Sequence, residues 1–89
     1  MKGTTAFYYP APVQGPEVAA MYAVLRKNLV DEMESRNWKF PDLTKRARIG
    51  YAALRRFMTE DTKTMPLHTA LSIAKAFEIP LEQLLEPRR

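Results

Sequence analysis

The sequence predicts an all-α fold of five helices, preceded by an extended N-terminal arm. Apolar residues recur at steps of three and four beyond residue 16, which is the spacing of a helix with one buried face. In that part of the chain, prolines stand near points where one helical pattern gives way to the next. Eighty-nine residues are enough for one such core and leave no room for a second. We therefore expect a single helical domain over residues 17–89.

Residues 1–16 differ from the rest of the chain. They contain two of the three glycines and the aromatic cluster Phe7-Tyr8-Tyr9, and their three prolines lie within seven positions. Prolines at that density exclude a helix, so the segment is predicted to be an extended arm, with a short strand over Thr4–Tyr9 as the alternative. Its composition favours packing against the bundle, a dimer mate or another protein, since Lys2 is the only basic residue that it offers to a DNA minor groove.

The first helix is predicted over Glu17–Arg36. Its acidic first residue and basic last residue suit the helix dipole, and Asn37 is a plausible stop. One apolar stripe runs along it, through Val18, Met21, Tyr22, Leu25, Leu29 and Met33.

Two short helices follow. Pro41 and Asp42 open the first of them, which turns Leu43 and Ala47 inward. Ile49 and Gly50 break it, and the next helix begins at Tyr51 and ends at Met58 or Thr59.

A polar loop, residues 59–64, leads to the last two helices. Pro66 sets the first turn of the fourth helix, Pro80 ends that helix, and a short fifth helix follows. The stripe predicted for the fourth helix is Leu67, Ala70, Leu71, Ala74 and Phe77, and that of the fifth is Leu81, Leu84 and Leu85.

The net positive charge of the chain is concentrated in residues 39–58. This segment carries +5 and the whole chain +4, so the other residues sum to −1. Its six basic residues face a single acid, Asp42. Such a focused positive field indicates an anionic partner, with double-stranded DNA as the leading candidate.

The third helix turns part of this charge outward. At 100° per residue, Ala53, Leu54 and Phe57 share the predicted buried side. The opposite side carries Ala52, Arg55 and Thr59, flanked by Tyr51 and Arg56. A helix that is small at its leading end and basic further along suits the major groove of DNA.

These segments resemble the lambda-repressor-like, Cro/CI-type (XRE family) helix-turn-helix proteins. The resemblance covers residues 24–86 and depends on the spacing Leu25…Leu29…Met33 and on segments 42–57 and 66–79, the latter being the most specific. It implies a compact five-helix bundle in which the helix from Tyr51 is the recognition helix. The family's base-contacting positions fall on Tyr51 and Ala52, with Arg55 and Arg56 further along.

The chain departs from the family pattern at three positions. Thr44 stands where alanine is usual, and Arg48 where the family has the glycine of the turn, so a left-handed turn there would be strained. Phe40 replaces a polar residue that often contacts phosphate, and Lys39 is expected to take over that contact.

Other chemistry is largely excluded. Without cysteine the chain has no disulfide or thiolate metal site, and the lone His68 has no partner for metal binding or catalysis. Neither a glycine-rich phosphate loop nor a nucleophile elbow occurs, so we expect no enzyme and no cofactor. No apolar run is long enough to span a membrane, and no signal peptide is recognisable, so a cytoplasmic protein is expected.

The predicted function is that of a sequence-specific transcriptional regulator, a repressor that binds a palindromic operator as a homodimer. Base contacts are assigned to Tyr51, Ala52, Arg55 and Arg56, and phosphate contacts to Lys39, Lys45, Arg46, Arg48 and Thr59. Two alternatives remain open. One is an antitoxin with the same bundle, whose arm at residues 1–16 would bind a toxin. The other is a protein-interaction adaptor that no longer binds DNA.

Overall fold

The computed structural model describes residues 16–88, and every element in that range is a helix. The order of the five helices confirms the predicted fold. They are α1 (Pro16–Arg36), α2 (Phe40–Ala47), α3 (Tyr51–Met58), α4 (Leu67–Phe77) and α5 (Leu81–Leu85). The predicted arm lies outside the described residues, except for Pro16, with which α1 begins.

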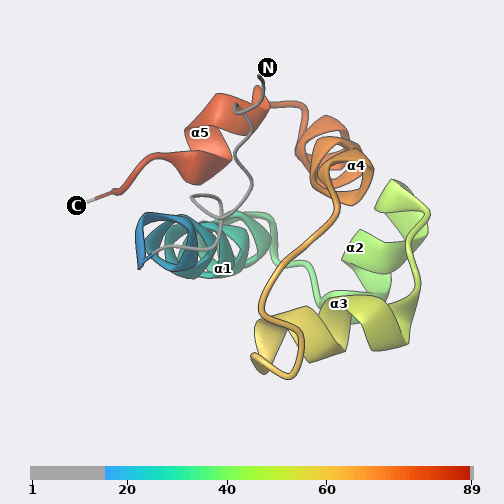
Figure 1. Cartoon of the computed structure of the whole chain (residues 1–89). Coiled ribbons are helices and arrows are strands. Elements are labelled where there is room, and N and C mark those ends of the chain that lie inside the picture. The colour runs from blue at the N-terminus through green and yellow to red at the C-terminus, as the bar shows by residue number, and fades with distance from the viewer. Residues whose placement is uncertain (1–15, 89) are drawn as a thin grey trace, which may run out of the picture.

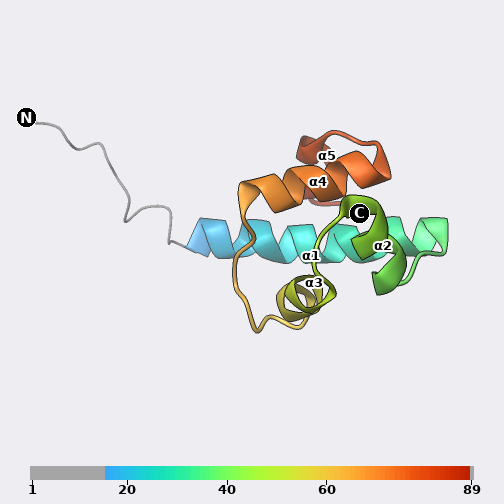
Figure 2. The same ribbon diagram turned by 90° about the vertical axis from the view of Figure 1, so that its right-hand side faces the viewer.

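The long helix α1 forms one side of the bundle, and the shorter helices pack around it (Figure 1). Helix α5 packs against α1 and α4, while α2 packs against both α3 and α4. In the second view α4 runs along α1, and α3 is seen nearly end-on on the other side of α1 (Figure 2). This arrangement leaves the outer sides of α2 and α3 free of any other helix.

All five helices contribute to one core. The predicted α1 stripe is confirmed at Leu25, Leu29 and Met33, all of which are buried. The other buried apolar residues are Leu43, Ala47, Leu54, Phe57, Met65, Ala70, Ile73, Ala74, Phe77 and Leu84.

The predicted stripe of α4 is wrong at two positions. Leu67 and Leu71 are 67% and 49% exposed, whereas Ile73, which the prediction omitted, is fully buried. The buried face of α4 is centred on Ile73, Ala74 and Phe77 and includes Ala70. At 100° per residue, Leu71 lies about 110° around the helix from the centre of that face. Within residues 16–88, an apolar flank of α4 is therefore left uncovered.

Polar contacts hold the end of the chain on α1. The fully buried Asn28 donates from Nδ2 to the carbonyl oxygens of Leu84 (2.9 Å) and Glu86 (2.8 Å). One turn later, Glu32 forms ion pairs with Arg36 and Arg88, the latter at 2.6 Å. Burial acts to raise the pKa of Glu32, but the hydrogen bonds from the two arginines and their positive charge outweigh it, so this pKa lies below its ordinary value.

Candidate nucleic-acid interface

Helix α2 begins with a sequence-encoded cap. Pro41 occupies the first turn, where its missing N–H leaves no hydrogen bond unmade, and the Asp42 carboxylate accepts the backbone N–H of Lys39 at 2.8 Å. Thr44 is buried, and its hydroxyl donates to the Pro41 carbonyl at 3.0 Å. Threonine therefore replaces the family's alanine without leaving a polar group unpaired.

The turn between α2 and α3 has a left-handed residue, and that residue is an arginine. Arg48 has φ 58° and ψ 47°, and its N–H and that of Ile49 both donate to the Thr44 carbonyl. Gly50, by contrast, is extended, with φ −72° and ψ 138°. The strained left-handed turn expected for Arg48 is thus present, and glycine does not occupy the position that would benefit from it.

Helix α3 follows at once, anchored by Leu54 and Phe57, which are both buried. The prediction that Ala53 is buried is wrong, because this residue lies at the rim of the buried face and is exposed. The residues assigned to DNA contact on this helix are all exposed: Tyr51, Ala52, Arg55, Arg56 and Thr59.

Two of these side chains already have contacts within the protein. The Tyr51 ring, 46% exposed, packs edge-on against Phe40 with the ring centroids 6.3 Å apart. Phe40, the first residue of α2, therefore supports the leading residue of α3, a contact that its position in the sequence did not suggest. The Thr59 hydroxyl donates to the Arg55 carbonyl at 2.9 Å, and this hydrogen bond caps the carboxyl end of α3.

An arginine on α1 holds the far end of α3. Nε of Arg26 donates to the Phe57 carbonyl at 2.7 Å, and Nη2 reaches the carbonyls of Thr62 and Lys63 at 3.2 Å each. Its guanidinium also lies 4.4 Å from the centroid of the Phe57 ring. A positive group at the carboxyl end of a helix is favoured by the helix dipole. Sequence reasoning missed this residue, since nothing in its spacing links α1 to α3.

Trp38 belongs to the junction between α1 and α2 and packs against α4. Its ring stacks on Phe77 with the centroids 5.4 Å apart and an interplanar angle of 20°. The Arg46 guanidinium lies over the Trp38 ring at 4.7 Å, and that of Arg36 over Phe77 at 4.9 Å. Arg46 is thereby held on one side of α2 by a cation–π contact.

The positive charge of residues 39–58 is not neutralised locally. Within residues 16–88, the ion pairs join only Lys27 to Asp31 and Glu32 to the two arginines described above. The six basic residues of the segment have no acidic partner there, and Asp42 is engaged with the Lys39 backbone. Within the described residues, the exposed basic side chains of α2, the turn and α3 therefore form a basic surface without ion pairs to acids.

Other kinds of site find no support in the described part of the chain. His68 is exposed, and no group of three His, Cys, Asp or Glu side chains within it could hold a metal ion. None of its helices is long and apolar enough to cross a membrane.

Comparison with known proteins agrees with this geometry. The model of the Cro/C1-type HTH DNA-binding domain family matches residues 28–88, well over half of the chain. This chain belongs to that family. The match includes the whole of α2, the turn and α3, so the Cro/C1-type assignment applies to the basic surface itself. No curated protein and no solved structure gives a significant match.

Membership in this family makes the chain a DNA-binding regulatory protein. Helix α3 occupies the place of the recognition helix, and the turn before it retains its backbone hydrogen bonds despite the unusual arginine.

Proposed function

We propose that this Cro/C1-type protein is a sequence-specific transcriptional repressor that binds a palindromic operator as a homodimer. The observation that carries the proposal is the exposed α3, which begins with small and aromatic residues, continues with arginines, and lies in a basic surface that has no ion pairs to acids within residues 16–88. Two such helices, related by a twofold axis, would enter successive major grooves about 34 Å apart.

The residues divide into two roles. Tyr51, Ala52, Arg55 and Arg56 are proposed to contact base edges, because they line the outer side of α3. Phosphate contacts, which supply affinity on any sequence, are assigned to Lys39, Lys45, Arg46, Arg48 and Thr59. Of these, Thr59 has to exchange its hydrogen bond with the Arg55 carbonyl in order to donate to a phosphate oxygen.

The homodimer is supported by the apolar flank of α4. Leu67 and Leu71 are large side chains that a small monomer exposes at a cost, and a second copy would cover them. We expect Leu71→Glu to shift the protein toward monomer in sedimentation equilibrium, since it places a charge on that flank without disturbing the core.

The first test is a salt titration of binding to the DNA upstream of the protein's own gene, beside a scrambled duplex of equal length. A preference of ~10³ or more for the upstream DNA, with a steep dependence on salt, is the expected result. Binding without preference would refute sequence-specific regulation.

The division of roles is tested by a pair of variants. Arg55→Ala should cost about 1–3 kcal/mol on the specific duplex and relax its sequence preference. Lys45→Ala should weaken binding to both duplexes alike, because it removes a phosphate contact only. Equal losses on both duplexes for both variants would contradict the assigned roles.

A further inference from the structure

A surface cleft lies between the carboxyl end of α2 and the neighbouring side of α4. Its volume is about 420 Å³, and it is lined by Arg46, Ala47, Arg48, Ser72, Lys75 and Ala76. Three of these six residues are basic and none is acidic.

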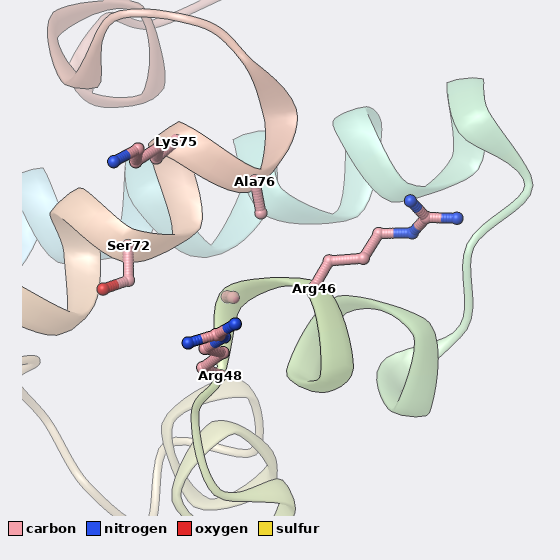
Figure 3. A pocket seen from close by; sticks show the side chains of 6 residues that line it. Arg46, Arg48, Ser72, Lys75 and Ala76 are labelled. Atoms are coloured by element: carbon pink, nitrogen blue, oxygen red, sulfur yellow. The ribbon is translucent and has the colours of Figure 1, made fainter.

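The basic side chains reach this cleft from different elements. In Figure 3 the Arg48 side chain extends from the turn and the Ser72 hydroxyl from α4, while the Lys75 side chain runs along α4 and ends away from Arg48. The Arg46 guanidinium points the other way, toward its contact with Trp38. Arg48 therefore borders the cleft from the turn and Lys75 borders it from α4, and Arg46 contributes its aliphatic stem.

Among the residues that the structure describes, neither Arg48 nor Lys75 has an acidic partner. Both are exposed, and the ion pairs within residues 16–88 involve neither of them. An anion that enters the cleft would therefore meet two basic side chains that no acid of residues 16–88 has neutralised. Arginine offers a planar fork of donors and lysine a compact charge, a combination that suits the several oxygens of a phosphate group.

We propose that this cleft binds a phosphate group, held by Arg48 from the turn and Lys75 from α4. Lys75 is new to the interface, since the contacts proposed above end at Thr59. The phosphate has two sources with the same chemistry. One is the backbone of the DNA, in which case the inference rests on the proposed function. The other is a free phosphorylated small molecule, which would join the turn before the recognition helix to α4.

Binding of a free phosphate in the cleft is tested in the absence of DNA. Thermal unfolding is followed with increasing inorganic phosphate, at constant ionic strength set with chloride, for wild type, Lys75→Gln, Lys75→Arg and Lys27→Gln. The control Lys27→Gln removes the same charge from α1, outside the cleft. A phosphate-dependent rise in Tm in wild type, Lys27→Gln and Lys75→Arg, and its loss in Lys75→Gln, is the result expected for this source.

The DNA source is tested by the salt dependence of duplex binding by the same four proteins. Loss of one backbone phosphate contact lowers the log–log slope by about 0.9. We expect that change in Lys75→Gln, with the slope retained in Lys75→Arg and in Lys27→Gln.

Either pattern supports the cleft and identifies the source of the phosphate. If Lys75→Gln behaves like Lys27→Gln in both measurements, the proposal is overturned. Failure of the proposed function has a different signature, because wild type would then show no preference between duplexes while the thermal measurement still decides whether the cleft holds phosphate.

Discussion

Replacing the left-handed turn residue, Arg48, with glycine is predicted to raise the stability of the protein and to lower its affinity for DNA. Arg48 sits at φ 58°, ψ 47°, a conformation that costs a residue with a Cβ roughly 1–2 kcal/mol. Glycine relieves this strain. Its greater conformational freedom in the unfolded chain, however, destabilises the folded state by about 0.5–1 kcal/mol and so offsets part of the gain. The Arg48 side chain is exposed, so little packing is lost. We expect Arg48→Gly to be more stable by about 0.5–1 kcal/mol, which raises Tm by about 2–8 °C.

The matched control is Arg48→Ala, which removes the guanidinium and keeps the left-handed penalty. Urea unfolding followed by far-UV circular dichroism should place this variant near wild type, below Arg48→Gly. Both variants should lose the same duplex affinity, because both lack the phosphate contact. A second control is Glu78→Gly, which relieves the same conformation (φ 62°, ψ 40°) at the end of α4. Its stability should rise while its DNA binding stays unchanged.

Two results would refute this reasoning. If Arg48→Gly is no more stable than Arg48→Ala, the turn stores no strain. If Arg48→Gly loses much more DNA affinity than Arg48→Ala, the side chain acts by holding the turn rigid, and its charge is not what the DNA requires.

Three further predictions concern the contacts that hold the helices together. Glu32→Gln should lower stability by about 1 kcal/mol at neutral pH. Since the folded pKa of Glu32 is lowered, this difference is present above about pH 4.5 and disappears as the pH falls below it, which unfolding curves between pH 3 and 6 would measure. Asn28→Ala should cost about 2–3 kcal/mol in urea unfolding, because it leaves the carbonyls of Leu84 and Glu86 unpaired. Arg26→Gln should speed amide hydrogen exchange at the end of α3 and lower duplex affinity, although the residue lies on α1; unchanged exchange would contradict a positioning role.

Periodicity predicted the fold well where a helix has one apolar face. In α1 the apolar residues at steps of four, Leu25, Leu29 and Met33, are indeed buried, although Met21 at the start of the predicted stripe is 36% exposed. In α4 the apolar residues surround most of the helix, and spacing alone gave no reason to prefer Ile73 over Leu71. Packing against α2 and α5 decided the orientation of that helix, and such packing is a property of the assembled bundle.

Helical periodicity also predicted most of the exposed residues of α3. It did not predict which residues of other helices hold α3 in place. The exposed positions of α3 follow from the burial of Leu54 and Phe57, because a short helix with two anchors has only one outward side. Arg26 holds α3 from a helix that is distant in sequence, and no spacing rule connects the two. Lys75, proposed above as a phosphate contact, is likewise brought beside the turn only when the helices are packed.

The pairing of three acids bears on the basic surface. Asp31 and Glu32 are paired with basic residues of α1 and of the carboxyl-terminal segment, so they neutralise charge away from α3. Asp42, within the basic segment, is engaged by the backbone at the start of α2. Within residues 16–88, the arginines that pair with an acid are Arg36 and Arg88, and those of α2, the turn and α3 have no such pair. At the turn the chain even places an arginine in a conformation suited to glycine, and an anionic partner for Arg48 gives a reason for that arrangement.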